Sequence, residues 1–278
     1  MNSICLSIAG SDSSGGAGIQ ADLKTFASLG CYGATVITAL TAQNTKGIRS
    51  VQELKPDFVK QQLEAVLEDL PVSAIKIGML CNAEIVQTVA EVLSQTSIPI
   101  ILDPIRFSTS GIPLFKSDQK LLSDRLLPLC ILITPNMKEA FWLANLPENS
   151  TRSIDTVGEM LLQEGAHAVL VTGGDLSGKT KTDCLKIKKA NNQIHTRVFK
   201  HHAVDSQNTH GTGCTLSSAI AAYLAKGNGL EQSVEKAISY VQACLKRSVH
   251  FYTGKGNGGL NHFPSDISHK MENNESTH

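Results

Sequence analysis

Short apolar runs alternate with longer amphipathic stretches along most of this chain, and this alternation restricts the fold more than any other feature. Runs rich in β-branched residues predict buried strands, and stretches with apolar residues three or four positions apart predict helices. The predicted strands are 4–9, 34–40, 74–78, 98–103, 130–134 and 168–172, with helices at 56–70, 83–93 and 153–164. Such alternation is typical of an α/β fold whose mostly parallel central sheet has helices on both faces.

The pattern changes after residue 172. Two β-rich segments, 183–188 and 193–199, flank the turn-forming residues 190–192 and predict an antiparallel hairpin at the edge of the sheet. Two further helices are expected at 212–226 and 230–250. We therefore expect one domain over residues 1–264, followed by a polar tail at 265–278 that lacks apolar periodicity and is frayed or disordered.

Composition narrows the class of ligand. The 25 basic and 25 acidic residues cancel and no basic block stands out, so neither nucleic acid nor an anionic membrane is favoured as a partner. The seven cysteines include no Cys-x-x-Cys pair, which favours reduced thiols over a disulfide framework or a zinc site. The sequence shows neither a basic-flanked leader nor an apolar run of ~20 residues. We expect a cytoplasmic protein that binds a small molecule.

Polar residues cluster where the predicted strands end. In open parallel sheets ligands bind at the carboxyl ends of the strands, so these clusters are expected to converge on one crevice. They are residues 10–18, 42–44, 78–79, 103–111, 134–139 and 172–175.

The segment 208–215 (NTHGTGCT) joins a glycine-rich turn to a predicted helix and predicts an anion site. Gly211 and Gly213 allow a tight turn and a close approach of the backbone to a ligand, and the first N–H groups of a helix lack intrahelical partners. A phosphoryl group suits this arrangement. The segment is neither a Walker-type loop nor a dinucleotide fingerprint, because the Gly-Lys-Ser/Thr ending and the required glycine spacing are missing.

Cys214 lies in the first turn of this predicted helix. There we expect the helix N-terminus to lower the pKa of its thiol, which suits a base or a group that orients the substrate. The alternative is that Cys214 is a small buried apolar residue, as lone cysteines commonly are.

A second glycine-rich segment, 9–22 (AGSDSSGGAGIQAD), also enters a predicted helix, but it contains no lysine or arginine. It therefore suits a compact neutral substrate better than a nucleotide phosphate. Asp12 and Asp22 can accept hydrogen bonds from a hydroxyl or amino group, or they can cap a helix and face solvent. Gln43, after the second predicted strand, carries an amide able to read the edge of a heterocycle.

Asn136 and Glu139 stand three residues apart at a predicted helix start, so both can face one side. A carboxylate and an amide near a phosphate site suit Mg²⁺ held largely through water, whereas the same spacing also forms a helix capping box. Asp103 ends an apolar strand, where its charge is costly unless it faces a cation or hydrogen-bond donors.

Taken together, the motifs resemble the ribokinase-like superfamily, and within it the hydroxymethylpyrimidine and phosphomethylpyrimidine kinases of thiamin synthesis. The resemblance covers nearly the whole chain and rests on AGSDSSGGAGIQADLKTFASLG, TALTAQNT, KIGML, LDP with a later SG, TPNMKEA, NTHGTGCTLSSAIAAYLAKG and GNGGLNHF. It implies transfer of the ATP γ-phosphate to the hydroxymethyl group of 4-amino-5-hydroxymethyl-2-methylpyrimidine, and then a second transfer that gives the diphosphate. It also implies a homodimer.

The resemblance assigns roles to particular residues. The pyrimidine pocket would comprise Gly10, Ala17, Asp22, Gln43, Met79 and Ile105. The anion hole would be Gly211, Thr212, Gly213 and Cys214, with Cys214 orienting or deprotonating the hydroxyl. Mg²⁺ would be organised by Asp103, Asn136 and Glu139, and ATP would contact Asn136, Thr172, Gly173 and Gly211. The adenine would lie against residues 230–243.

Two positions depart from the family pattern. Thr109 precedes Ser110-Gly111 and Thr172 precedes Gly173-Gly174, where the family typically has lysines. Each missing cation could have neutralised phosphate charge, worth on the order of a few kcal/mol in a dry site. Arg106, at a position that is normally apolar, either replaces one of these cations or points to solvent.

Two other functions remain open at the level of sequence. A pyridoxal kinase shares this fold and acts on a similar hydroxymethyl heterocycle. A degenerate protein that binds the pyrimidine or a nucleotide without turnover would also fit the missing lysines.

Overall fold

The computed structural model describes residues 3–108, 111–174 and 178–264. The polar tail expected at 265–278, together with Thr109 and Asp175, lies outside these residues. Within them the strands are β1 (Ile4–Asp12), β2 (Tyr32–Asn44), β3 (Gly47–Glu53), β4 (Ala74–Ile77), β5 (Ile100–Leu102), β6 (Leu132–Ile133), β7 (Ala168–Val171), β8 (Thr180–Lys188) and β9 (Ile194–His202). The helices are α1 (Gly18–Ser28), α2 (Pro56–Asp69), α3 (Ala83–Leu93), α4 (Gln119–Arg125), α5 (Met137–Leu143), α6 (Ile154–Gln163), α7 (Thr212–Ala225) and α8 (Leu230–Ser248).

All the described strands belong to one sheet in the order β3-β2-β1-β4-β5-β6-β7-β8-β9. The strands from β2 to β7 pair in parallel, whereas β3, β8 and β9 run antiparallel to their neighbours. The predicted parallel sheet and the hairpin at its edge are therefore confirmed.

The opposite edge was not predicted. Residues 42–44, expected to follow a strand, lie in β2, which continues to Asn44 and turns back into β3. Strand β3 escaped prediction because it is an edge strand whose residues are exposed or half-buried, so its sequence, GIRSVQE, lacks a buried apolar run.

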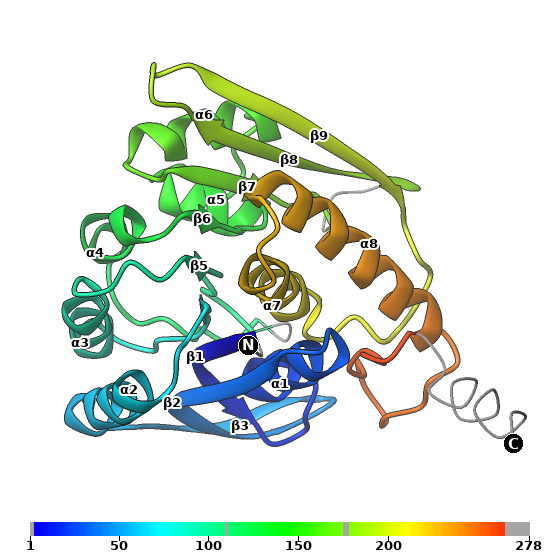
Figure 1. Ribbon diagram of the computed structural model, residues 1–278. Coiled ribbons are helices and arrows are strands. Elements are labelled where there is room, and N and C mark those ends of the chain that lie inside the picture. The colour runs from blue at the N-terminus through cyan, green and yellow to red at the C-terminus, as the bar shows by residue number, and fades with distance from the viewer. Residues whose placement is uncertain (1–2, 109–110, 175–177, 265–278) are drawn as a thin grey trace, which may run out of the picture.

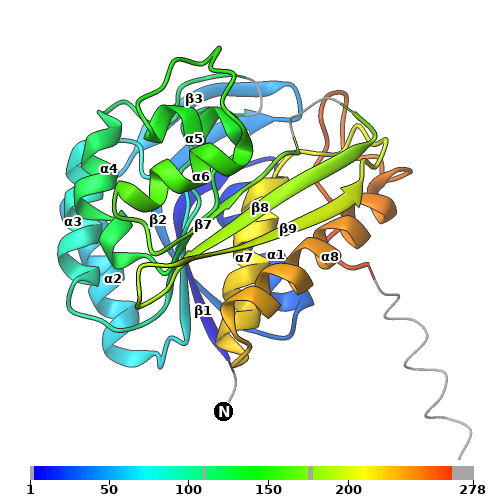
Figure 2. The ribbon, with the colours of Figure 1, turned by 90° about the horizontal axis from the view of Figure 1, so that it is seen from above.

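Helices cover both faces of the sheet. Helices α2 to α6 lie on one face and α1, α7 and α8 on the other, as Figures 1 and 2 show from two directions. Each layer closes its own apolar core against the sheet: one contains Val59, Leu63 and Leu161, and the other contains Phe26 and Ile220. This sandwich leaves the carboxyl ends of the parallel strands free to form a site.

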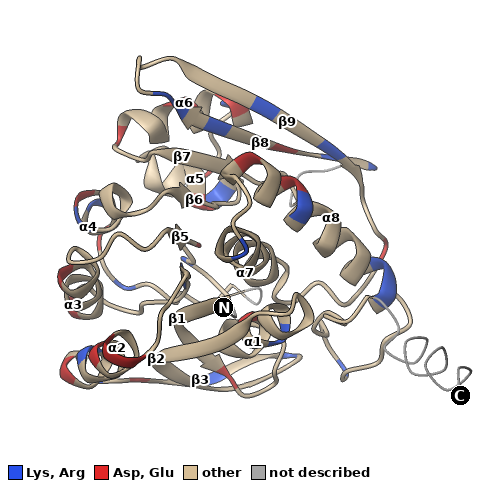
Figure 3. Cartoon of the chain, in the orientation of Figure 1, with Lys and Arg blue, Asp and Glu red and all other residues tan. Residues whose placement is uncertain are grey.

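Local capping explains where several of the helices begin. Helix α2 starts with Pro56, and the side chains of Asn82 and Ser153 accept hydrogen bonds from the first turns of α3 and α6. Acidic and basic residues are interspersed over the helices and edge strands (Figure 3). All seven cysteines are unpaired and buried. Among the described residues, no helix combines the length and apolar character needed to cross a membrane.

Candidate active site

A cavity of about 1000 Å³ opens at the carboxyl ends of the parallel strands. It gathers most of the residues expected to form a site, although they are spread over two hundred positions of sequence. Those that line it are Gly10, Ala17, Gln43, Met79, Asp103, Ile105, Asn136, Glu139, Thr172, Gly211, Thr212, Gly213 and Cys214. Asp22 and Gly173 are not among the lining residues.

The predicted anion loop forms at the start of α7. Gly211 has a φ of +83°, and a Cβ there would lie 1.9 Å from the carbonyl oxygen of Gly16, so the two glycine-rich loops touch through backbone. Thr212 Oγ1 donates to the carbonyl of Thr209 at 2.7 Å and stiffens the turn. Among the described residues, no side chain caps α7, so its N-terminus is open to an anion.

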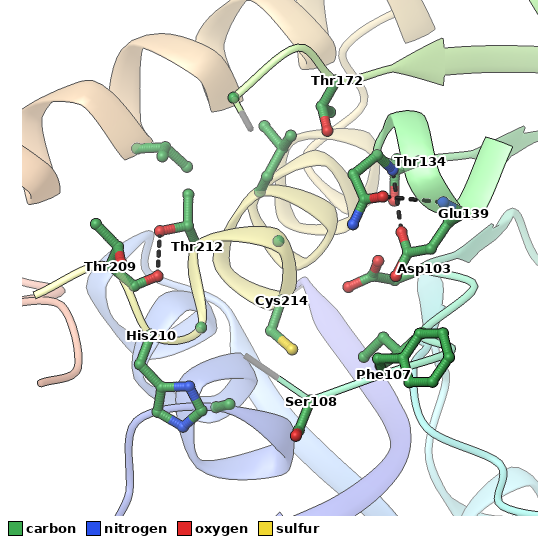
Figure 4. A pocket seen from close by; sticks show the side chains of 18 of the residues that line it. Asp103, Phe107, Ser108, Thr134, Glu139, Thr172, Thr209, His210, Thr212 and Cys214 are labelled. Atoms are coloured by element: carbon green, nitrogen blue, oxygen red, sulfur yellow. Dashed lines mark hydrogen bonds between the residues drawn. The ribbon is translucent and has the colours of Figure 1, made fainter. Parts of the chain in front are cut away.

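The structure contradicts the expected acidity of Cys214. Burial raises the pKa of its thiol to about 12, and the charge of nearby Lys76 opposes this only in part. The field of a helix N-terminus is modest, whereas removing a thiolate from water is expensive, so desolvation dominates. Figure 4 shows the thiol facing the cavity, with Asp103, Ser108 and His210 around it. It meets a ligand as a neutral thiol.

The prediction that Asp22 belongs to the pyrimidine pocket is wrong, because Asp22 does not line the cavity. It does accept hydrogen bonds from hydroxyl groups, as one of its two expected roles requires, but it does not face solvent as the other requires. Its side chain is fully buried and forms an ion pair with Lys76 Nζ at 2.9 Å. It also accepts from the hydroxyls of Ser7 and Ser218. A buried carboxylate needs this many partners, so Asp22 anchors the sheet, α1 and α7 beneath the cavity.

Asp103 stands at the end of β5, beside the anion loop. A Cβ added at Gly213 would lie 3.7 Å from the Asp103 carboxylate, and Ser217 Oγ donates to that carboxylate at 3.3 Å. Burial raises the pKa of Asp103 to about 6, although Lys76 acts in the opposite direction. The carboxylate would gain from a further cation in the cavity.

Asn136 and Glu139 form the capping box that their spacing allowed. Asn136 Oδ1 accepts from the Glu139 N–H and Glu139 Oε2 accepts from the Asn136 N–H, both at 3.0 Å (Figure 4). Both residues nevertheless line the cavity. Capping and ligand contact are therefore compatible here, because each side chain has a second polar atom beyond the one used in the box.

These oxygens suit Mg²⁺ better than a tightly caged metal. Among the described residues, no three His, Cys, Asp or Glu side chains cluster in a way that could hold an ion. Mg²⁺ typically takes one or two carboxylates and completes its shell with water and substrate phosphates. Asp103 and Glu139, both on the cavity wall, supply that number.

The other end of the cavity suits a flat heterocycle. Gly10 leaves room for Met79, because a Cβ there would lie 2.9 Å from the Met79 sulfur. The half-buried Ile105 and the amide of Gln43 complete this end. Asp12 and His210 also line it, with His210 Nε2 2.9 Å from Asp12 Oδ2.

Arg106 lines the cavity with a partly exposed side chain. Its guanidinium pairs with Glu148 at 3.2 Å and stacks over Phe107 and Trp142 at 4.7 and 5.4 Å. Arg106 therefore lines the cavity, but its guanidinium is ion-paired with the exposed Glu148 carboxylate and not directed at the anion loop. Thr172, which directly follows β7, also lines the cavity (Figure 4).

Helix α8 supplies an apolar wall. Ile238, Val241 and Leu245 face the cavity together with Leu216 of α7, and Ile238 and Val241 fall inside the segment expected to contact adenine. At its edge, His201 Nδ1 lies 3.0 Å from Gln242 Nε2, and Asp183 bridges His201 to the backbone N–H of Gly173.

Sequence reasoning missed one residue beneath the cavity, Lys76, and one that lines it, His210. Lys76 interrupts a buried strand, AIKI, and a charge in an apolar strand is itself a sign of a buried partner. His210 stands inside the anion-loop motif, yet its contacts with Asp12 and Gln43 join segments far apart in sequence. Nothing local in the sequence indicates such contacts.

Comparison with known proteins agrees with this geometry. The family model described as phosphomethylpyrimidine kinase matches residues 12–261. The hydroxymethylpyrimidine/phosphomethylpyrimidine kinase of Rhizobium meliloti is 42% identical over 270 residues, which cover 95% of this chain and 98% of the relative.

Solved structures give the same result. The phosphomethylpyrimidine kinase of Clostridium difficile superposes with a TM-score of 0.73 at 41% identity, covering 86% of this chain and 97% of that one. The pyridoxal kinase of Staphylococcus aureus in complex with AMP-PCP and pyridoxal superposes with a TM-score of 0.82 at 29% identity, covering 96% of each chain. With its fold, its cavity and its family match in agreement, the chain belongs to the phosphomethylpyrimidine kinase family.

Proposed function

We propose that this chain transfers the γ-phosphate of ATP to 4-amino-5-hydroxymethyl-2-methylpyrimidine and then phosphorylates the monophosphate to the diphosphate, in thiamin synthesis. The observation that carries the proposal is that one cavity contains two different kinds of binding surface. It combines a heterocycle-sized end at Gln43 and Met79 with an anion loop at Gly211–Cys214. The Rhizobium meliloti relative is named as a kinase of both pyrimidines, which supports both transfers.

The residue roles follow from this arrangement. Gly10, Ala17, Met79 and Ile105 would pack the ring, Gln43 would read its edge, and the backbone of Gly211, Thr212 and Gly213 would hold the transferring phosphoryl group. Because the Cys214 thiol is neutral at pH 7, its proposed role is to orient the hydroxyl and not to act as a base. Phosphoryl transfer depends mainly on positioning and charge neutralisation, so it tolerates the lack of a strong base.

The nucleotide would occupy the other end of the cavity. Asn136 and Thr172 would contact its phosphates, and the adenine would lie against Ile238 and Val241. Gly173, whose N–H donates to Asp183, would hold the backbone next to Thr172 in place. Asp103, Asn136 and Glu139 would hold Mg²⁺, which when bound neutralises phosphate charge. This neutralisation matters here because threonine replaces the family lysine at position 172.

The proposal also includes the domain organisation, the oligomeric state and the location of the chain. One continuous sheet across the described residues supports a single domain over 1–264. A homodimer in the cytoplasm would fit the family resemblance.

The test is to incubate the full chain with ATP and Mg²⁺ and offer the hydroxymethylpyrimidine, its monophosphate and pyridoxal separately, following each product by mass. We expect the monophosphate and then the diphosphate from the pyrimidine, and no product when EDTA removes Mg²⁺. Binding of the pyrimidine without any product would instead favour the degenerate binding protein.

A second candidate, pyridoxal kinase, rests on the likeness to the Staphylococcus aureus enzyme. The same assay separates the two candidates. Higher kcat/KM for pyridoxal than for the pyrimidine would overturn the main proposal.

A further inference from the structure

One ring nitrogen of His210 contacts two different side chains. His210 Nε2 lies 2.9 Å from Asp12 Oδ2 and 3.0 Å from the terminal amide nitrogen of Gln43. All three side chains line the cavity. A single nitrogen cannot donate its proton to the carboxylate and also accept one from an amide N–H, so one of these contacts must be reassigned.

Asp12 decides which contact stands. Its carboxylate already accepts from the N–H groups of Ser14, Gly16 and Ala17 and from the Ser14 hydroxyl. Burial alone would raise the pKa of Asp12, but the hydrogen bonds from His210 and Ser14 outweigh it and hold the pKa at about 2. The carboxylate is therefore ionised and purely an acceptor, and the proton sits on His210 Nε2.

The orientation of the Gln43 amide follows from that proton. An amide N–H facing the Nε2–H would make no hydrogen bond, whereas the amide oxygen can share that proton with Asp12 Oδ2 in a three-centre hydrogen bond. A 180° rotation of the amide exchanges its two terminal atoms. After this rotation the NH₂ group occupies the position 3.2 Å from Thr41 Oγ1 and donates a hydrogen bond to that hydroxyl. The Thr41 hydroxyl donates its own proton to the carbonyl of Ser11 at 3.0 Å. Each terminal atom of the amide then has a hydrogen-bond partner.

We propose that His210 is a positioning residue that fixes the amide of Gln43 with its oxygen on the His210 side, and thereby directs the hydroxymethyl group of the pyrimidine toward Gly211–Cys214. The inference rests on the proposed function and deepens it. His210 then determines whether the 4-amino group of the ring lies on the His210 side or on the Thr41 side of the Gln43 amide.

The hydrogen-bonding edge of the pyrimidine links the orientation of the Gln43 amide to the direction of the hydroxymethyl group. The edge of a 4-aminopyrimidine presents a ring nitrogen that accepts and an amino group that donates, which matches the N–H and C=O of one amide. With the amide oxygen on the His210 side, the 4-amino group must lie on that side as well. The 5-hydroxymethyl carbon is the next ring substituent. It therefore points toward the loop that His210 itself begins, and Figure 4 shows His210 and Cys214 on the same side of the cavity.

The test compares the amino substrate with its 4-oxo analogue, 5-hydroxymethyl-2-methylpyrimidin-4-one, whose edge has donor and acceptor exchanged. The wild-type chain should prefer the amino compound strongly. In His210→Leu the amide is free to rotate and match the analogue, so the ratio of kcat/KM for amino over oxo should fall by about tenfold or more. A general structural loss would lower both rates and leave the ratio unchanged.

Thr41→Val is the matched control. It removes the other contact of the amide but leaves the His210 proton in place, so the ratio should stay within about threefold of wild type. An unchanged ratio in folded His210→Leu would overturn the inference, as would an equal fall in Thr41→Val.

If His210→Leu does not fold, a crystal structure of the wild-type chain tests the same orientation. In a crystal structure of the wild-type chain with the hydroxymethylpyrimidine, the 4-amino group should lie on the His210 side. A ring bound with its amino group on the Thr41 side would overturn the inference. Failure of the wild-type chain to phosphorylate the pyrimidine at all would instead overturn the proposed function, so the two failures are distinct.

Discussion

At the scale of single residues, Cys214 shows how burial overrides local position. Its place in the first turn of α7 favours a thiolate. The side chain is buried, however, so a thiolate would lose the hydration that stabilises its charge. The pKa of about 12 leaves the thiol protonated at every pH at which the chain is expected to work. A neutral thiol can donate one weak hydrogen bond and fill space, which is the role of an orienting group.

Replacement of Cys214 by serine is therefore expected to be mild. The hydroxyl can orient the substrate as the thiol does, so kcat should fall by no more than about tenfold, and Cys214→Ala should fall further. Because neither group ionises between pH 6 and 9, the kcat–pH profiles of wild type and Cys214→Ser should have the same shape. A basic limb present in wild type and lost only in the serine variant would show that a thiolate is the working form.

At the scale of elements, the ion pair of Asp22 and Lys76 joins α1, β4 and α7. Lys76 Nζ contacts both oxygens of Asp22 at 2.9 Å, and Ser218 of α7 donates to the same carboxylate. Both charged side chains are fully buried. The anion loop begins α7, so this pair sets the position of the loop relative to the sheet.

Removing one partner should be costly. Lys76→Met leaves the Asp22 carboxylate buried without its cation, and the free energy of unfolding should fall by about 3–5 kcal/mol. Urea unfolding measures this. The matched control is Lys60→Met, which breaks a 3.8 Å pair with Glu64 whose side chains are roughly half exposed, and it should cost less than about 1 kcal/mol. Similar losses in both variants would show that the buried pair is not special.

At the scale of the whole molecule, the segment after α8 returns to the site. His210 pairs with Gly259 as a β-bridge, and Tyr240 Oη donates to the His262 carbonyl at 2.6 Å. His262 Nε2 lies 3.0 Å from Thr215 Oγ1 of α7, and its Nδ1 has no hydrogen-bond partner among the described residues. The closing segment therefore buries a neutral histidine against the helix that holds the anion loop.

This histidine should make stability depend on pH. Burial, assisted by the charge of Lys24, lowers the pKa of His262 to about 4 from its ordinary 6.5. Between these values the unfolded chain binds more protons than the folded chain, so stability is lost as the pH falls from 6.5 to 4. The loss from this group should reach about 3 kcal/mol.

Urea unfolding of wild type and His262→Leu across this range isolates the effect, since all other groups cancel in the difference. The stability difference between the two chains should change with pH in favour of the variant as the solution becomes more acidic. His202→Gln, at an exposed position, serves as the control and should show no such change. A pH-independent difference for His262→Leu would contradict the prediction.

The elements that could be predicted from sequence are those whose signal is local. The periodicity of residues 83–93 gave α3 with its observed bounds, and the turn at 190–192 gave the hairpin of β8 and β9. The capping box at Asn136 was visible as a spacing of three. The clusters at strand ends predicted one shared site because parallel strands all end at the same edge of a sheet.

Tertiary structure alone decided the electrostatics and the cross-chain contacts. The sequence could not show that Asp22 would find Lys76, that Cys214 would lose its water, or that His210 would meet Gln43 across 167 positions. Periodicity, caps and turns depend on neighbours a few residues away, and so they are written in the sequence itself. Burial and charge pairing depend on which distant segments pack together, and only the folded chain fixes that.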